Sequence, residues 1–285
     1  MKLSIITLTY NKLKYTKKYI DSLFKYTKDF ELIIVDNGSC DGTREYLKSL
    51  NNVKLIFNDE NVGFSKGNNQ GLEIAEGEYI GFLNNDILLS PNWFEECEKV
   101  FIKGDNTAFV SPTQLCPKFE NVTSENYMEK FIPSDSFYKT FDDCQFACVI
   151  TKRAVLNNVG IFDENFSPAF FEDNDLKCSA IEKGYNTYVT KNACFFHYSS
   201  ITSAKLNQKF EDNRLYFYKK HRFAEYLTIY ANENQVYKEK ARAFETGFLA
   251  FVYKIYLFVQ KVKRNLKRMF KKWKFYSMQQ SFHIF

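Results

Sequence analysis

Several motifs that mark other classes of protein are missing from this sequence. No two cysteines have the CxxC spacing, and the seven cysteines are scattered along the chain. We therefore expect buried, reduced thiols, as in a cytosolic protein. Neither a GxGxxG motif nor a Walker loop occurs, which argues against dinucleotide and P-loop chemistry. The N-terminal apolar run is short and is interrupted by Thr7, Thr9 and Asn11, so no signal peptide is expected.

Spread basic patches are also missing. The net charge is +5, but much of the excess lies in one stretch, KVKRNLKRMFKKWK, at residues 261–274. A nucleic-acid-binding surface is therefore not expected. With 45% hydrophobic residues among 285, the chain is too apolar for disorder and long enough for one large domain with an appendage.

The first part of the chain alternates apolar strands with segments of helical spacing. Strands are predicted within residues 2–8, 31–39, 53–58 and 78–86. Helices are predicted within 15–26, 43–50 and 66–76, the last closed by Gly77. This alternation predicts an α/β fold with a Rossmann-like, mostly parallel sheet and helices on both faces.

The second part of the chain has a looser pattern. Residues 113–143 are polar and aromatic and are predicted to form a loop region over the site. A strand at 146–151 follows, with Thr151 capping a short helix that ends at Gly160. A helix at 175–183, closed by Gly184, precedes strands at 187–190 and 193–197. Helical stretches dominate from residue 206, so we divide the chain into a domain, 1–215, and a helical region, 216–285.

Polar clusters follow three of the predicted strands. They are Thr9-Tyr10-Asn11, Asp36-Asn37-Gly38 and Asn84-Asn85-Asp86. Ligands of open α/β sheets bind at the carboxyl ends of the strands, where these clusters fall. Asp86 supplies the charge for a hard divalent cation, with room left for phosphate oxygens. The structural alternatives are a polar turn before Pro91 and, for Asp36, an Asx-turn.

A pair of acids, Glu172 and Asp173, stands just before the helix predicted at 175–183. The helix dipole alone favours acids at this place. The aromatic lead-in Phe170-Phe171 adds a second reason, because it sets a carboxylate at a partly dry pocket wall, where a general base is useful. His197 ends the apolar run ACFFH, and a lone histidine there has a structural alternative.

Four stretches, IITLTYN, NVGFSKGNNQG, LNND and FFEDNDL, together resemble a family 2 glycosyltransferase of the GT-A fold, especially its rhamnosyltransferase-like branch. The resemblance covers about residues 1–215. It implies that Asp36 accepts a hydrogen bond from the imide N–H of uracil or thymine. It also implies that Asp173 is the catalytic base, with Glu172 beside it. Asp86 would hold Mg²⁺ or Mn²⁺, and His197 would complete that site.

The resemblance further implies a set of residues that bind the donor. They are Thr7, Thr9, Tyr10, Asn11, Asp36, Asn37, Gly63, Phe64, Gly67, Asn68, Asn69, Asn84 and Asn85. Asn84 departs from the commoner aspartate of the family's DxD motif and offers a neutral oxygen instead. The glycines of NVGFSKGNNQG have a structural alternative, the close packing of a helix.

The resemblance implies a metal-dependent, inverting hexosyl- or deoxyhexosyltransferase. It would move a sugar from a UDP- or dTDP-linked donor to a hydroxyl of a glycan or lipid-linked acceptor, in bacterial-type surface polysaccharide synthesis. Two alternatives stay open. A sugar nucleotidylyltransferase usually has a glycine-rich basic loop near its N-terminus, and IITLTYNKLKYT lacks the glycines. A non-catalytic, membrane-docked sugar-nucleotide-binding protein is compatible with Asn84.

The C-terminal stretch 247–274 joins an apolar part to the basic run. The apolar part, 247–259, has about 13 residues and contains Lys254, so it is too short to cross about 30 Å of hydrocarbon. Its composition suits an in-plane helix on anionic lipid, which predicts a cytoplasmic protein peripheral at the inner membrane surface. The alternative is a basic helix packed on the body or on a partner.

Overall fold

The computed structural model describes residues 2–115, 128, 131–198 and 207–221. The chain forms two compact units, residues 1–219 and 220–285, and nearly all of the described residues belong to the first. The boundary predicted between 215 and 216 falls inside helix α8 (Asn207–Lys220) and stays a prediction. The apolar and basic stretch 247–274 lies outside the described residues. No helix among the described residues is long and apolar enough to cross a membrane.

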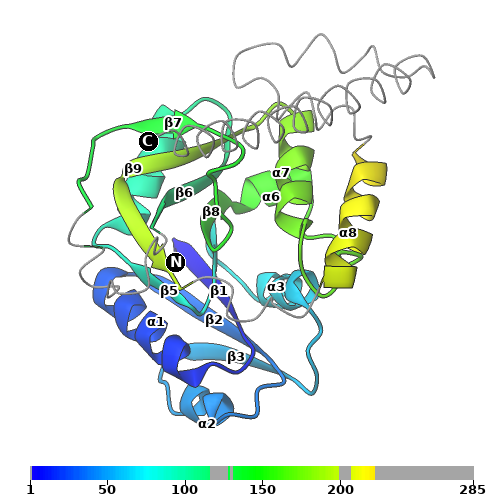
Figure 1. Ribbon diagram of the computed structural model, residues 1–285. Helices are drawn as coiled ribbons and strands as arrows, with labels where there is room; N and C mark the ends of the chain where they lie inside the picture. The colour runs from blue at the N-terminus through cyan, green and yellow to red at the C-terminus, as the bar shows by residue number, and fades with distance from the viewer. Residues whose placement is uncertain (1, 116–127, 129–130, 199–206, 222–285) are drawn as a thin grey trace, which may run out of the picture. The chain divides into compact units, whose positions relative to one another are not determined.

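The first half of the unit repeats a strand-then-helix pattern (Figure 1). The elements are β1 (Leu3–Thr9), α1 (Leu13–Tyr26), β2 (Phe30–Asn37), α2 (Thr43–Lys48), β3 (Val53–Asn58), α3 (Phe64–Glu73) and β4 (Tyr79–Leu83). All four strands run parallel, in the order β3-β2-β1-β4. Their carboxyl ends therefore share one edge of the sheet, as the sequence predicts.

The second half extends the same sheet with strands of both directions. Its elements are β5 (Ile87–Leu89), α4 (Trp93–Lys103), β6 (Thr107–Leu115), β7 (Phe137–Lys139), β8 (Cys148–Lys152), α6 (Arg153–Val159), α7 (Glu172–Glu182), β9 (Asn186–His197) and α8. The strand order continues from β4 through β8, β6 and β9 to β5, and β7 pairs with β9. The α/β class is confirmed, with a sheet that is parallel over β1 to β4 and mixed beyond.

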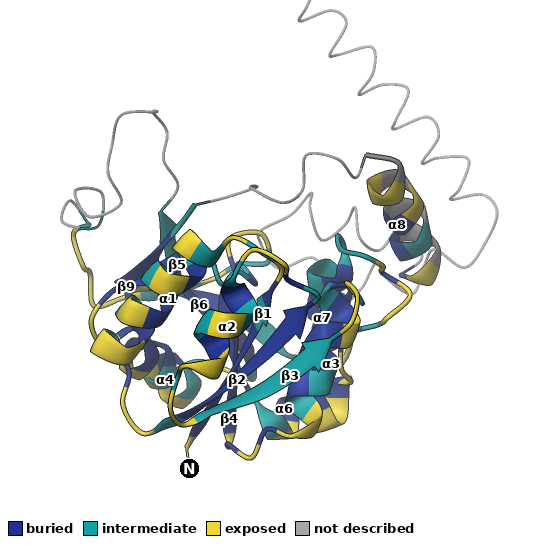
Figure 2. Ribbon diagram, turned by 90° about the horizontal axis from the view of Figure 1, so that it is seen from below, coloured by how far each residue is buried: buried dark blue, intermediate teal, exposed yellow. Residues whose placement is uncertain are grey.

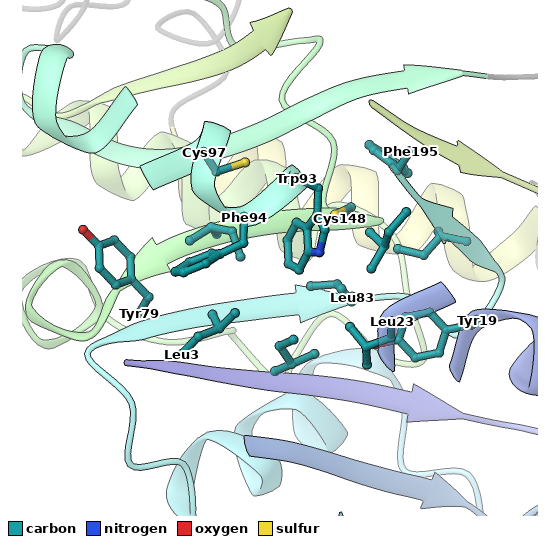
Figure 3. Packing of buried hydrophobic residues seen from close by; sticks show 14 of the residues in the cluster. Leu3, Tyr19, Leu23, Tyr79, Leu83, Trp93, Phe94, Cys97, Cys148 and Phe195 are labelled. Atoms are coloured by element: carbon teal, nitrogen blue, oxygen red, sulfur yellow. The ribbon is translucent and has the colours of Figure 1, made fainter. Parts of the chain in front are cut away.

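Alternation along the strands produces two cores, one on each face of the sheet. Leu3 and Ile5 of β1 join the first core, with residues of α1, α2 and α4. Ile6 joins the second core, with residues of α3, α6 and α7. Figure 3 shows part of the first core, in which Trp93 is completely buried beside Cys97 and Cys148. Figure 2 shows buried strands, with β3 intermediate, between helices whose outer sides are exposed.

The segment that ends α3 differs from its prediction. The helix ends at Glu73, with Ile74 as its C-cap, so Gly77 is not the cap. Gly77 lies against β1 instead, where its N–H donates to Ser4 Oγ at 2.6 Å. A Cβ at residue 77 would come within 2.6 Å of the Ser4 nitrogen. Glycine is needed at 77 for this close approach of two backbones, which helical spacing does not reveal.

Four further predictions differ from the structure. The N-cap of α6 is Lys152, with no side-chain cap bond, so the predicted cap at Thr151 is wrong. The strands predicted at 187–190 and 193–197 are one strand, β9, with a shift of register against β6 between Pro112 and Thr113. Helix α7 begins at Glu172 rather than at 175. Within the loop region predicted at 113–143, residues 113–115 end β6, and β7 is a further short strand.

The described cysteines fit the prediction of reduced thiols. Five of them are buried and free, and Cys40 is exposed. Burial raises the pKa of the Cys144 thiol to about 12, which keeps it protonated and unreactive. The five buried thiols therefore act as core side chains.

Candidate functional site

Asp36, near the end of β2, is fully buried and bonded through both carboxylate oxygens. Its Oδ2 accepts a hydrogen bond from Thr9 Oγ1 at 2.9 Å. Its Oδ1 accepts one from the Ser39 N–H at 3.0 Å and one from Arg44 Nε at 2.7 Å. Arg44 also donates to the carbonyl of Asn58 and lies over the ring of Phe57. The carboxylate therefore ties together the ends of three neighbouring segments, and Oδ2 keeps a second lone pair for a further donor.

The turn after β1 is fixed to the turn after β2. Asn11 has a φ of 58°, its N–H donates to Ser39 Oγ at 2.7 Å, and its Oδ1 accepts from the Cys40 N–H at 2.9 Å. Tyr10 is 40% exposed beside this turn, so its ring is accessible to a ligand. Thr7 is fully buried, and its hydroxyl shares a hydrogen bond with that of Tyr19. The structure thus brings Thr9, Tyr10 and Asn11 to the edge and leaves Thr7 in the core.

A network of side-chain amides connects β2, β3 and α3. Asn37 Oδ1 accepts from Asn58 Nδ2 at 2.9 Å, and Asn58 exchanges two hydrogen bonds with Gln70. Asn37 Nδ2 donates to the Gly63 carbonyl at 3.2 Å, and Asn61 Oδ1 accepts from the Gly63 N–H at 2.9 Å. Gly63 has a φ of 91°, a left-handed value that glycine adopts without strain. The network holds the loop that begins α3.

The glycines inside α3 serve close packing, as the structural alternative proposed. A Cβ at Gly67 would lie 2.8 Å from Leu8 Cδ2, and one at Gly71 would lie 2.5 Å from Ile6 Cγ2. Asn68 and Asn69 are buried between α3 and its neighbours. Asn68 Nδ2 donates to the Phe64 carbonyl within the helix at 3.0 Å. Asn69 Nδ2 donates at 2.9 Å to the carbonyl of Phe162, in the loop before α7. These residues position the helix and that loop.

The two residues predicted as metal ligands meet in space. Asp86 Oδ1 and His197 Nε2 lie 3.2 Å apart, and each side chain is 16% exposed. The sheet explains the meeting, because Ile87 pairs with His197 in the antiparallel β5–β9 ladder. The Tyr198 N–H also donates to the Asp86 carbonyl oxygen at 3.0 Å. Sequence spacing could not predict this contact, since β5 was not foreseen as a strand.

The two asparagines before Asp86 are held by the elements beside them. The Asn84 N–H donates to the Ala147 carbonyl at 2.9 Å. This bond involves the backbone of Asn84 and not its side chain, which is partly exposed. Asn85 Nδ2 donates to Thr16 Oγ1 of α1 at 2.9 Å. Among the described residues, no group of three or more His, Cys, Asp or Glu is arranged to hold a metal ion. Asp86 and His197 thus form a two-residue pair.

The paired acids occupy the first turn of α7 in contrasting surroundings. Glu172 is buried, and its Oε2 has no hydrogen-bond partner among the described residues. Burial, together with the negative charge of Asp173, raises the pKa of Glu172 to about 8. Asp173 is partly exposed, and its Oδ1 accepts from the Asn174 N–H at 2.7 Å. Glu172 therefore keeps its proton near neutral pH, and Asp173 is the member of the pair that solvent and a ligand can reach.

Backbone contacts bring the acid pair to the carboxyl edge of the sheet. The Phe64 N–H, at the start of α3, donates to the Pro168 carbonyl at 2.8 Å. Because α3 follows β3, its first turn stands at that edge, and Pro168 lies a few residues before Glu172. The structure thus gathers Asp36, Asp86 and the acid pair on one side of the molecule.

Sequence reasoning missed several residues of this region. Arg44 stands eight positions after Asp36 without a local signal of its partner. Lys177 is buried in α7, and its Nζ donates to the carbonyls of Phe141 and Cys144 at 3.1 and 3.4 Å. A lysine one helical turn after Asp173 could have been noticed as a candidate neighbour of the acid pair.

Comparison with known proteins identifies the family. The sequence model described as Glycosyl transferase family 2 matches residues 4–160, more than half of the chain. The chain belongs to glycosyltransferase family 2. The match contains Asp36 and residues 84–86 and ends before Glu172 and His197. It confirms the family predicted from the motifs, while the rhamnosyltransferase-like branch stays a prediction.

Individual relatives agree with this family. A glycosyltransferase of Rickettsia typhi is 26% identical over 256 residues, covering 85% of this chain and 79% of the relative. A Rickettsia bellii glycosyltransferase is 28% identical over 62% of this chain. Chondroitin synthase of Pasteurella multocida is 35% identical over 39% of this chain. The chain spans only 25% and 12% of the lengths of the last two.

Solved structures support the fold. S. aureus TarS 1-349 superposes with a TM-score of 0.54 at 21% identity, covering 79% of this chain and 74% of that one. A longer S. aureus TarS structure gives a TM-score of 0.57 at 19% identity, over 80% of this chain and 42% of that one. This likeness concerns the fold, and it agrees with the predicted GT-A architecture.

Proposed function

We propose that this chain is an inverting glycosyltransferase that moves a sugar from a nucleotide-diphosphate donor to a hydroxyl of a glycan or lipid-linked acceptor. The observation that carries the proposal is the 3.2 Å approach of Asp86 and His197, at the sheet edge that also holds Asp36. Relatives named chondroitin synthase and hyaluronan synthase favour a role in polysaccharide synthesis. Bacterial surface polysaccharide is the product class that we propose.

The donor would lie along the carboxyl edge of β1, β2 and β4. In family 2 the aspartate that Asp36 matches meets the imide N–H of uracil or thymine, so UDP- and dTDP-sugars are the donors to test first. Because Asp36 is fully buried, the base would reach its Oδ2 only when the turns beside it open. Tyr10, exposed at the end of β1, offers a ring for the nucleoside. The buried Thr9 acts on the donor through Asp36, to which it donates.

A divalent cation, Mg²⁺ or Mn²⁺, fits the pair formed by Asp86 and His197. One carboxylate and one imidazole, partly exposed, leave most coordination positions for phosphate oxygens and water. When bound, such a cation supplies positive charge to the diphosphate as it leaves. Asn84, next to the pair, contributes a neutral oxygen for the sugar or the cation.

The acid pair would act on the acceptor. Asp173 takes the proton from the acceptor hydroxyl while that oxygen bonds to C1 of the donor sugar. The bond between C1 and the diphosphate oxygen breaks in the same displacement, which inverts the anomeric centre. Glu172, kept neutral by burial, adds no second charge beside the base. An enzyme of this kind needs no covalent intermediate, so no cysteine is given a role.

A donor screen followed by a transfer assay tests the proposal. Thermal shift with Mn²⁺ should select the donor, because a ligand at about 100 times its Kd adds about 2.7 kcal/mol to the stability. With that donor, Asp173→Asn should lower transfer by roughly 10²-fold or more and keep donor binding. Asp86→Ala should abolish metal-dependent donor binding.

Asp105→Asn is the matched control, because Asp105 is exposed and precedes β6 at the opposite edge of the sheet. It should behave like the parent chain. Normal turnover by Asp173→Asn would exclude Asp173 as the base. Donor binding without any transfer or hydrolysis by the parent chain would favour a sugar-nucleotide-binding protein instead.

A further inference from the structure

The two residues before the acid pair have a backbone conformation that aromatic side chains rarely adopt. Phe170 has a φ of 85° and Phe171 a φ of 72°. Left-handed backbone brings the Cβ of an L-residue against its own carbonyl oxygen, so two such residues in succession persist only where their surroundings hold them. Strain of this kind gathers at sites that position a side chain. Glu172 and Asp173 follow directly.

Helix α8 holds this strained pair through one amide. Asn213 is 5% exposed, and its Nδ2 donates to the Ala169 carbonyl at 2.8 Å and to the Phe170 carbonyl at 3.3 Å. One amide nitrogen thus donates to two successive carbonyls. These carbonyls belong to the peptide groups on either side of Phe170, so the two bonds restrict the φ and ψ angles of Phe170.

Aromatic rings of α8 hold the same pair from the side. The Phe210 ring lies 5.3 Å from that of Phe170 and 5.1 Å from that of Phe171. The Phe217 ring, which is fully buried, lies 5.5 Å from that of Phe171. Figure 1 shows α8 beside α7, on the side of the sheet where α3 lies. The residues that hold the pair thus come from an element more than thirty positions later in the chain.

The other end of the loop is fixed by α3. The Phe64 N–H donates to the Pro168 carbonyl at 2.8 Å, and a Cβ at Gly63 would approach the Pro168 oxygen to 3.0 Å. Helix α7 then starts on the strained residue itself, because the Asp175 N–H donates to the Phe171 carbonyl at 2.8 Å. The direction of the first turn of α7, which carries Asp173, therefore depends on the conformation of Phe170 and Phe171.

We propose that Asn213 is a positioning residue for the transfer reaction: by holding the carbonyls of Ala169 and Phe170 it aims Asp173 at the acceptor hydroxyl. The inference rests on the proposed function, in which Asp173 takes the acceptor's proton. Asn213 acts on the loop through these two bonds, and the Phe64–Pro168 bond on the donor side does not involve it. Its loss should therefore change turnover and leave donor affinity intact.

Asn213→Leu in the full chain is the test, because leucine has nearly the same shape and no amide. We expect kcat to fall by roughly 10²-fold, the usual effect of misplacing a reacting group by about 1 Å, with donor Kd and KM within about twofold of the parent. Asn165→Leu is the matched control. Asn165 is exposed in the same loop and donates to Tyr216 of α8 at 3.3 Å, but it does not bond to the strained carbonyls, so its kcat should stay within about twofold.

A second variant separates positioning from folding. Phe170→Gly removes the strain, because glycine adopts a φ of 85° freely. In a chain that carries Phe170→Gly, Asn213→Leu should lower kcat much less than it does in the parent. A double-mutant cycle measures this difference. Asn213→Ser, which keeps one donor, should be folded and have an intermediate kcat if the leucine variant does not fold.

The outcomes are distinct for the inference and for the function on which it rests. The positioning role would be overturned if Asn213→Leu left kcat unchanged. It would also be overturned if Asn213→Leu lowered kcat and donor affinity together and Phe170→Gly did not reduce these losses. Failure of the proposed function looks different, because the parent chain itself would then transfer no sugar and Asp173→Asn would have no effect to compare.

Discussion

Replacing Glu172 with glutamine tests whether the buried carboxyl of the acid pair is neutral in the folded protein. Burial raises the pKa of Glu172 from 4.5 to about 8. The folded protein therefore keeps a proton that the unfolded chain loses above about pH 4.5, and the unfolded state is favoured as the pH rises. Glutamine mimics the neutral acid at every pH. The stability difference between the variant and the parent should then grow between about pH 5 and pH 8 and level off above that.

The size of the effect follows from one proton. One proton held only by the folded state changes the free energy of unfolding by about 1 kcal/mol per pH unit. For a unit of about 220 residues, that corresponds to about 3 °C in Tm per pH unit. Groups that titrate in both proteins cancel in the difference, so the slope reports on Glu172 and on the groups coupled to it.

Thermal unfolding of the parent and of Glu172→Gln from pH 5 to pH 9, without donor or metal, is the assay. Glu95→Gln is the control, because Glu95 also lies in the first turn of a helix but is exposed. Its curve should run parallel to that of the parent. A parallel curve for Glu172→Gln as well would refute the reasoning, since it would mean that Glu172 is charged in the folded protein at all of these pH values.

Two further predictions concern the packing of α3 and the C-terminal stretch. Gly71→Ala should destabilise the fold by about 1–3 kcal/mol in urea unfolding, because its Cβ would meet Ile6 Cγ2 at 2.5 Å, while the exposed Lys66→Ala should cost almost nothing. A chain ending near residue 232 should stay folded and soluble, keep transfer to a small soluble acceptor, and lose co-sedimentation with anionic vesicles. The full chain should leave those vesicles, at least in part, as salt rises, and equal binding by both chains would contradict the membrane role.

Local patterns were sufficient to predict the first half of the fold. Each of β1 to β4 is an apolar run, three of them end in a polar cluster, and parallel pairing of neighbours then places Thr9, Asp36 and Asn84 on one edge. Both the strands and the clusters can be recognised within a few residues of the chain. Close packing is less visible from sequence, because the need for Gly77 arises from Ser4, which lies in another element.

The second half depends on contacts between distant segments. Helix α7 begins earlier than predicted, because Glu172 and Asp173 form its first turn. The helix dipole favours acids equally in the first turn and just before the helix, so the two acids do not show where the helix starts. The strained Phe170-Phe171 step and its partner Asn213 have no local signature. Hydrophobic spacing cannot reveal a left-handed phenylalanine, since only its tertiary partners make that conformation stable.

The two acidic groups of the site suit different tasks because their surroundings differ. Asp86 is partly exposed and faces the imidazole of His197, an arrangement that lets a cation reach both side chains. Glu172 is buried beside Asp173, and two like charges so close in a dry place cannot both form easily. The pKa of Glu172 is accordingly raised to about 8, so this carboxyl holds its proton while the more exposed Asp173 is the one that an acceptor can meet. Asp86 with His197 on one side and the acid pair on the other would therefore place a cation and a proton acceptor at separate points of one sheet edge, as the proposed transfer from a diphosphate donor to a hydroxyl requires.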